Sequence, residues 1–338
     1  MKRFKRVSAL TLFLLLIVYA CLRFGNRRID KVSPRNPGTD TQSPTVEIAF
    51  FNSHLLPPIA KSIVGKRSSA DYRCTQIAHQ LSQFDLFGLS EVFDEKLAAK
   101  MIDKMNADPK HIFSFARSPS PTGVFQFASG GLILFSRFPI LEQNSLVFTD
   151  GSRFLTSEFR AADGLAAKGA LHAAIKLNAT HELDCFLVHL ESFSASIRSK
   201  QVGELVAFIN SHHRAGVPYL LMGDFNIKGP LSSDSSGYKE YIDLVTQSSM
   251  SGFKMVDLAM ETLDGNLAKG TSDALSENGG DRIDYLLLAV PTSDSIEWSA
   301  TSKTIRFLDG AVKEGSLSDH AAIWTRIRFG PSDADHLN

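Results

Sequence analysis

The residues best placed to do chemistry follow an apolar run that ends in Gly-Asp-Phe-Asn. Residues 220–222 are typical of a buried strand, and Asp224 and Asn226 come directly after it. Because residues two apart on a strand point to the same face, an anionic acceptor and a neutral amide would look at one point. An Asx turn after a strand is the simpler interpretation. The catalytic interpretation of Asp224 and Asn226 therefore depends on polar residues at the ends of the other predicted strands.

Four other polar groups stand at the ends of strand-like runs. Glu91 closes one run and is a candidate metal ligand, and His189 closes another. Asp284 begins a run too apolar to face water, and a buried carboxylate needs a partner. Asp319 and His320 lie side by side before the last strand-like run. Asp284 is therefore the predicted group that orients His320.

The first predicted strand of the folded region, residues 46–51, ends at an amide, Asn52. A lone histidine is more often a surface or core residue than a catalyst. Six polar strand-end groups in the order Asn, Glu, His, Asp-x-Asn, Asp and Asp-His are harder to attribute to chance. Together they predict metal-dependent phosphodiester chemistry.

This order of motifs resembles that of the endonuclease/exonuclease/phosphatase superfamily, which has the DNase I-like fold, across residues 44–330. Within it, the chain is most similar to neutral sphingomyelinases. Residues 52–57, Asn-Ser-His-Leu-Leu-Pro, look like an Asn-x-x-Leu-Leu-Pro opening, and residues 91–94, Glu-Val-Phe-Asp, are similar to a metal motif of that group. The resemblance implies an α/β fold, a four-layer sandwich of two packed mixed β-sheets flanked by helices. Apolar residues at three- and four-residue spacing predict helices over residues 71–84, 94–106, 195–213 and 238–249.

A third segment, residues 163–169, resembles the Asp-x4-Lys-Gly sequence of the same group. By that resemblance Lys168 would approach the substrate and Asp163 would set the position of the lysine. The ordinary interpretation of a lysine, a solvated surface cation, competes with this one.

The resemblance also implies a metal ion. Mg²⁺ prefers oxygen ligands, so Glu91, with Asn52 close by, would hold one ion that stabilises the phosphoryl oxygen and the leaving alkoxide. Mn²⁺ and Co²⁺ are alternatives to Mg²⁺. His189 and Asn226 would donate hydrogen bonds to the phosphoryl oxygens as charge develops.

His320 is the candidate general base. Held by Asp284, it would take a proton from a water that attacks phosphorus, while Asp224 helps to position that water. Asp319 would lie close to the metal or to the imidazole. Which of His189 and His320 is base and which is acid stays open at this stage.

These features predict a Mg²⁺-dependent phosphodiesterase, a sphingomyelinase C-type phospholipase that converts sphingomyelin to ceramide and phosphocholine. An exported DNase I-like nuclease is the alternative. Lys plus Arg and Asp plus Glu both number 36, so the chain lacks the basic excess that most nucleic-acid binders carry. The expected partners are a phospholipid substrate and a membrane surface, and no protein partner is indicated.

The N-terminal region has the pattern of a targeting element. Basic residues precede a charge-free, mainly apolar stretch over residues 7–22, which predicts a signal peptide or a signal-anchor helix over residues 1–22. Residues 23–43 resemble a linker in composition, residues 44–330 form the predicted catalytic domain, and residues 331–338 are a tail. The expected protein is exported, anchored to a membrane or secreted, with its catalytic domain outside the cytoplasm.

Overall fold

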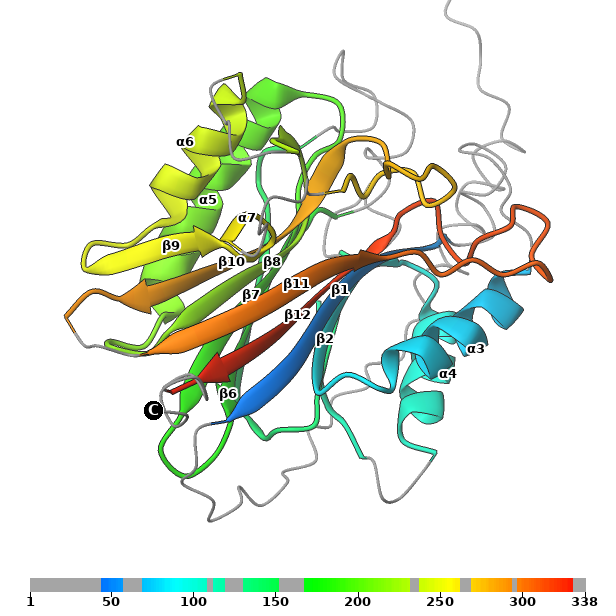
Figure 1. Ribbon diagram of the computed structural model, residues 1–338, viewed down its shortest axis with the longest axis horizontal. Coiled ribbons are helices and arrows are strands. Elements are labelled where there is room, and N and C mark those ends of the chain that lie inside the picture. Colours follow the sequence, from blue (N-terminus) through cyan, green and yellow to red (C-terminus); the bar gives the residue numbers. More distant parts are fainter. Residues whose placement is uncertain are drawn as a thin grey trace, which may run out of the picture.

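The computed structural model describes residues 44–56, 69–107, 112–118, 130–151, 167–231, 237–261, 269–293 and 297–330. They form two six-stranded sheets that pack face to face and carry helices on their outer faces (Figure 1). The predicted four-layer α/β sandwich is confirmed. The predicted targeting segment, the linker, the tail and Asp163 lie outside the described residues. Within those residues, no helix combines the length and apolarity needed to cross a membrane.

The first sheet contains the strands that lead to Asn52 and Glu91 and the last strand of the described residues. Its strands are ordered β11-β12-β1-β2-β4-β3; β1 and β2 are parallel, and the other pairs are antiparallel. Helices α3 and α4 cover its outer face (Figure 1). The bounds are β1 Thr45–Leu55, α3 Ala70–Leu81, β2 Leu86–Val92, α4 Glu95–Met105, β3 Ser114–Arg117, β4 Ile133–Ser136, β11 Trp298–Ile305 and β12 Ala322–Phe329.

The second sheet has a similar plan, with its one parallel pair, β7 and β8, near its centre. Its strands are ordered β5-β6-β7-β8-β10-β9, and helices α5 and α6 lie on its outer face (Figure 1). The bounds are β5 Ile140–Val147, β6 Gly169–Lys176, β7 Glu182–His189, α5 Ala195–His212, β8 Tyr219–Gly229, α6 Lys239–Ser248, β9 Phe253–Asp257, α7 Leu258–Glu261 and β10 Arg282–Pro291.

Burial on both faces explains why the central strands read as continuous apolar runs. In β8, Leu220 and Met222 point into the core between the sheets, whereas Leu221 packs under the helices of the outer layer. In β1, Phe50 and Phe51 divide in the same way. Each such side chain contributes about 1.5–3 kcal/mol by leaving water. The alternation fixes which face every polar residue beyond these positions must take.

The four predicted helices are confirmed as α3, α4, α5 and α6, with ends that differ by up to three residues. The start of α4 is set by Asp94, whose carboxylate accepts hydrogen bonds from the backbone N–H groups of Lys96 and Leu97. Ser194 caps α5 through the N–H of Ile197. Such caps satisfy donors that the first helical turn leaves open. The last residue of the Glu-Val-Phe-Asp motif therefore starts a helix.

Candidate active site

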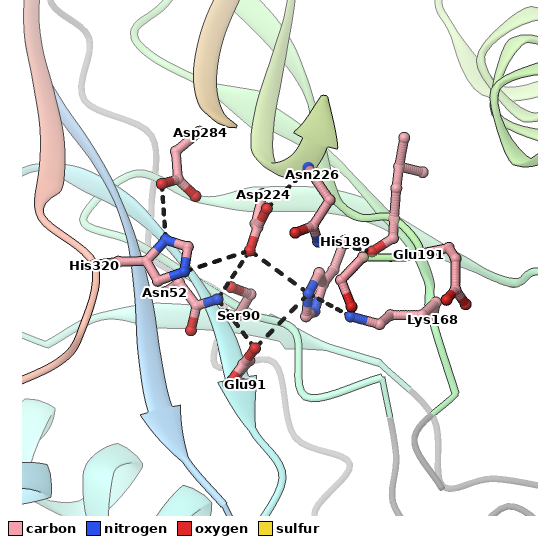
Figure 2. Close-up of polar contacts among 12 residues, drawn as sticks. Asn52, Ser90, Glu91, Lys168, His189, Glu191, Asp224, Asn226, Asp284 and His320 are labelled. Carbon is pink, nitrogen blue, oxygen red and sulfur yellow. Dashed lines mark hydrogen bonds and ion pairs between the residues drawn. The ribbon is translucent and has the colours of Figure 1, made fainter. Parts of the chain in front are cut away.

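The site lies where the apolar packing between the two sheets ends and the same strand faces continue with polar residues. Asp224 comes two residues after Met222 on β8, and His189 comes two residues after Leu187 on β7. Asn52 extends the face of Phe50 in the same way. Since alternate strand residues share a face, the sheets themselves deliver these side chains to one space (Figure 2).

A glycine permits the close approach of the two central strands beside Asp224. Gly223 pairs with Val188 of β7, and a Cβ atom at Gly223 would lie 2.1 Å from the Val188 carbonyl oxygen. Any larger residue would push β8 away from β7. The Gly-Asp step in the sequence therefore has a structural cause as well as a chemical one.

Three residues reach the site by leaving the regular strand conformation. Among the described residues, the non-glycine positions with positive φ are His54, Ser69, Glu91 and Asn226, and all except Ser69 belong to the site. Strict alternation from Leu89, which packs under the helices, would send Glu91 to the helix side of the sheet. Its φ of 59° turns it toward Asn52 instead. Backbone strain of this kind costs on the order of 1–3 kcal/mol and concentrates at functional positions.

Asp224 is the centre of the polar cluster. The Asn52 amide nitrogen donates to Asp224 Oδ2 at 2.9 Å and to Glu91 Oε1 at 3.1 Å. His189 Nε2 lies 3.7 Å from the same Asp224 oxygen and 3.9 Å from Glu91 Oε1. Burial, together with the neighbouring charge of Asp284, raises the pKa of Asp224 to about 7. The cluster therefore holds more negative charge than its own donors neutralise.

His320 and Asp284 form the predicted pair, with 2.9 Å between Nδ1 and the Asp284 carboxylate. The other imidazole nitrogen, Nε2, is 3.9 Å from Asp224 Oδ2 (Figure 2). Burial acts to lower the pKa of His320, but the charges of Asp284, Asp224 and Asp319 raise it to about 10. Asp284 thus orients the ring so that Nε2 faces the cluster.

Thr271 holds this pair in place from behind. Its hydroxyl accepts the backbone N–H groups of Ile283 and Asp284, each at 3.2 Å. Its carbonyl accepts the N–H of Ala321, the residue after His320, at 2.8 Å. Thr271 is fully buried. One residue therefore ties both members of the pair to the loop before β10.

Lys168 lies beside His189. The Lys168 Nζ and His189 Nε2 atoms are 2.6 Å apart, and the lysine is buried. An ammonium group has only donors, so His189 Nε2 accepts this hydrogen bond and the ring carries its proton on Nδ1. Donation from Nε2 to a phosphoryl oxygen then requires both that Lys168 bond to another acceptor and that Nε2 gain a proton. The structure does not describe Asp163, the predicted partner of the lysine.

Asp319 and Asn226 lie at the margins of the cluster. Asp319 Oδ2 is 3.2 Å from His54 Nδ1, and that nitrogen is 3.5 Å from Glu91 Oε2. Asp319 therefore contacts His54, and its charge also contributes to the raised pKa of His320. The Asn226 side chain donates to the Leu190 carbonyl at 3.0 Å, while its backbone N–H donates to Asp224 Oδ1 at 2.9 Å.

The sequence interpretation missed His54 and Thr271. His54 occupies an unspecified position of the Asn-x-x-Leu-Leu-Pro segment, and its contacts arise from residues distant in sequence. Thr271 lies in a loop rich in Ser, Gly and Asp, where a threonine carries no special signal. Ser90, adjacent to Glu91, is also buried at the site (Figure 2). Neither residue type nor spacing marks these positions.

The donor set fits a hard divalent cation. Two carboxylate oxygens, from Glu91 and Asp224, converge on the Asn52 amide nitrogen, so their negative charges face one point. The Asn52 amide oxygen accepts the backbone N–H of His54 at 3.2 Å, and carboxylate and amide oxygens are the ligands that Mg²⁺ prefers. The ligand atoms of Glu91, His189 and Asp224 lie within 4.8 Å of one another, as do those of Asp224, Asp284 and His320. The raised pKa of Asp224 is consistent with a place that lacks positive charge.

Sequence comparison finds relatives of this chain. Sphingomyelin phosphodiesterase 5 of Danio rerio is 27% identical over 183 residues, which cover 47% of this chain and 32% of that protein. Sphingomyelinase C of Bacillus cereus is 23% identical over 220 residues, which cover 60% of this chain and 63% of that protein. The chain thus spans a third of one relative and somewhat under two thirds of the other.

Solved structures show the same fold. A mutant of the beta toxin of Staphylococcus aureus, solved with bound magnesium ions, has a TM-score of 0.63 at 15% identity and covers 83% of this chain and 99% of that chain. A family protein from Bacteroides thetaiotaomicron has a TM-score of 0.61 at 17% identity and covers 86% and 96%. The model of the endonuclease/exonuclease/phosphatase family matches residues 65–320, most of the chain. This protein belongs to the endonuclease/exonuclease/phosphatase family.

Proposed function

We propose that this chain is a divalent-metal-dependent phosphodiesterase that hydrolyses sphingomyelin to ceramide and phosphocholine. The observation that carries the proposal is the convergence on Asp224 of an oriented imidazole, His320, and of the Asn52–Glu91 pair. The relatives named as sphingomyelinases support the substrate class. Each part of the site supplies one requirement of the reaction.

Glu91 and Asn52, with the Asp224 carboxylate beside them, would hold the cation. When bound, a hard cation neutralises a phosphoryl oxygen and stabilises the leaving alkoxide. The Glu91 side chain is 18% exposed and that of Asp224 is 2% exposed, so solvent reaches Glu91 more readily. Because both carboxylates and the substrate phosphate are negative, the phosphate can bind beside them only when their charge is offset.

His320 moves the proton. Its Nδ1–H donates to Asp284, so Nε2 is the nitrogen that exchanges a proton with water or with the leaving oxygen. With a pKa of about 10, His320 carries a proton on both ring nitrogens at neutral pH. Offsetting the charge of Asp224 lowers the pKa of His320 and so favours its action as a base, because Asp224 is one of the groups that raise that pKa. Proton transfer of this kind contributes about 10²- to 10⁴-fold to rate.

Lys168 supplies positive charge on the His189 side of the cluster, away from His320 (Figure 2). It is buried against His189, where a cation is poorly screened by water and acts strongly on developing charge. In the proposed reaction it donates to a phosphoryl oxygen. Nε2 of His189 can then accept a hydrogen bond on the same side, or donate one once that nitrogen is protonated.

The substrate assay compares two classes of phosphodiester. The full chain is incubated with Mg²⁺ and either sphingomyelin-containing liposomes or plasmid DNA, and release of phosphocholine and nicking are followed. We expect phosphocholine release that chelators abolish and that His320→Ala removes. Nicking of DNA without release of phosphocholine would favour the nuclease alternative.

Two lysines, one just before β6 and one at its end, test the substrate side of the proposal. Lys168 immediately precedes β6, and Lys176 ends it, paired with Glu182 at 2.9 Å. We expect Lys168→Ala to reduce hydrolysis of sphingomyelin in a bilayer by about 10²-fold, as for loss of one preorganised donor, and Lys176→Ala to leave it unchanged. Equal effects of the two substitutions would contradict this role. Asp163→Ala is expected to impair the enzyme and to couple to Lys168→Ala in a double-mutant cycle.

The proposal includes a location. The basic and apolar pattern of residues 1–22 supports export, with the catalytic domain outside the cytoplasm and held at a membrane or secreted. Fractionation of cells, with protease added from outside, tests this separately from catalysis. Recovery of a protease-protected protein in the cytoplasm would contradict it.

A further inference from the structure

A buried arginine outside the catalytic cluster connects its two halves. Arg73, on α3, is 1% exposed. Its Nη1 donates to the carbonyl oxygens of Ser53 at 3.2 Å and Leu317 at 2.9 Å, and its Nη2 donates to the carbonyl oxygen of His54 at 3.0 Å. The three acceptors come from two segments more than 260 residues apart in the sequence. One guanidinium therefore bonds to the backbone of both.

The two segments carry different parts of the site. Ser53 and His54 follow Asn52 directly, and the His54 ring contacts Glu91. Leu317 comes three residues before His320. Any change in the spacing of these backbones changes the distance between the metal-ligand groups and the imidazole.

The sheet itself does not join the segments at this point. The ladder between β1 and β12 runs from Thr45 and Arg328 to Phe50 and Ile323, and it stops there. Beyond Phe50, the register between β1 and β2 also shifts, between Asn52 and Leu55. Arg73 bonds to both segments beyond the end of the ladder, at Ser53 and His54 after Phe50 and at Leu317 before Ile323. It replaces the regular backbone pairing with side-chain donors where the chains diverge toward the site.

We propose that Arg73 is a positioning residue, which fixes the separation between the Asn52–Glu91 side of the site and the His320 side. The proposal rests on the proposed function for its catalytic readout. An arginine is suited to this role because it keeps its charge when buried and presents its N–H donors in a rigid, planar fork. A lysine carries the same charge but has one flexible ammonium group, so it cannot hold three carbonyls in the same geometry. A buried charge is costly, and the contacts here give it a use in setting geometry.

The experiment compares Arg73→Lys with Arg214→Lys in the full chain. Arg214 is the matched control because it also holds two segments together, at one end of β7. Its backbone N–H and its Nε each donate a hydrogen bond to the Asp184 carboxylate at 2.8 Å. That end is opposite to His189. We expect Arg73→Lys to lower kcat by about 10²-fold with little change in KM, since misplacement of reacting groups by about 1 Å has that effect. We expect Arg214→Lys to lower the unfolding temperature and to leave kcat unchanged.

Two further measurements separate positioning from general stability. Arg73→Ala should recover activity when guanidinium chloride is added at low concentration, and urea at the same concentration should not restore it. Amide hydrogen exchange should become faster in residues 317–321 and 52–56 of the Arg73 variants, and it should stay unchanged in β7 and β8. If Arg73→Ala does not fold, Arg73→Lys and Arg73→Gln carry the same measurements.

The outcomes are distinct. Loss of kcat in Arg73→Lys alone, with faster exchange in the two segments, supports the proposal. Equal losses in the two lysine variants, or unchanged exchange in residues 317–321, overturn it. If the wild type hydrolyses no phosphodiester at all, the proposed function fails, and the exchange measurement still decides whether Arg73 holds the two segments together.

Discussion

Two histidine–aspartate pairs among the described residues, His320–Asp284 and His172–Asp184, differ in their surroundings. His320 and Asp284 meet at 2.9 Å at the edge of the sheets, with 12% of the histidine side chain exposed. His172 and Asp184 meet at 3.4 Å inside the second sheet, and neither side chain is exposed. The same two residue types thus occur in an open pair and in a closed pair of one fold.

The difference lies in what the remaining atoms of each pair contact. Asp184 also accepts hydrogen bonds from the backbone and the side chain of Arg214. The His172 ring stacks on Phe186 at 4.7 Å, and its Nδ1 lies 3.3 Å from the Asn144 amide nitrogen. In the open pair, His320 Nε2 faces Asp224 across 3.9 Å. A carboxylate and an imidazole form a candidate site when one ring nitrogen is left facing a space that a substrate can enter.

Substitutions that remove each pair in turn should separate catalysis from stability. We expect His320→Ala and Asp284→Asn each to lower kcat by about 10³-fold or more, because the aspartate fixes the tautomer of the reacting imidazole. The double variant should be no worse than the poorer single variant, since residues that act as a unit are not additive. His172→Gln should leave kcat unchanged. Steady-state kinetics on sphingomyelin liposomes measures all four.

Loss of the closed pair should appear in stability instead. We expect Asp184→Asn to lower the free energy of unfolding by about 3 kcal/mol, since removal of one partner leaves the charge of Arg214 without its buried partner. Burial acts to raise the pKa of Asp184, but the hydrogen bonds from His172 and Arg214 hold it below its ordinary value of 3.8. This contribution is therefore present above pH 3.8 and is lost as the pH falls through the lower folded pKa.

Urea unfolding at neutral pH and at low pH measures this effect. The gap between wild type and Asp184→Asn should be largest at neutral pH and should shrink in acid. A variant that unfolds like the wild type while losing activity would reverse the assignment of the two pairs.

The open pair should also depend on the groups that share its space. We expect Glu91→Gln to weaken Mg²⁺ binding by roughly a hundredfold. Loss of a group that only hydrogen-bonds to a metal ligand typically lowers metal affinity about 10- to 100-fold, and loss of a charged ligand should cost at least as much. Isothermal titration calorimetry with Mg²⁺ measures this without turnover. Glu182→Gln is the control, because Glu182 begins β7 at the end opposite to His189, and this variant should bind Mg²⁺ as the wild type does. Unchanged Mg²⁺ affinity in Glu91→Gln would remove Glu91 from the ligand set.

The sequence predicted the open pair because its residues stand at strand ends. Asp284 begins a strand and His320 precedes one, and burial of both strand faces made the fold readable from the apolar runs. His172 lies in the middle of a run, where a polar residue gives no sign of its partner. The turn of Glu91 toward the site depends on a positive φ, which residue type does not reveal. The contacts of His54 and Arg73 depend on strand order, which emerges only when the sheets are assembled.

The smallest effect we expect is a change in the titration of His320, and it tests the origin of the open pair directly. The ordinary pKa of histidine is 6.5. In this protein burial acts to lower the pKa of His320, but Asp284, Asp224 and Asp319 raise it to about 10. A folded pKa above the unfolded one means that the charged imidazole stabilises the fold. That stability is fully present below pH 6.5 and is lost as the pH rises through about 10.

We therefore expect Asp284→Asn to lower the pKa of His320 most and Asp224→Asn to lower it less, because Asp284 contributes both charge and a hydrogen bond whereas Asp224 contributes charge alone. Nuclear magnetic resonance of the histidine ring, recorded on metal-free protein against pH, gives both values. The unfolding midpoint of the wild type should also fall, relative to that of His320→Gln, between pH 6.5 and about 10. A His320 that titrates near 6.5 in the wild type would mean that Asp284 orients the ring without stabilising its charge, and the open and closed pairs would then differ in access alone.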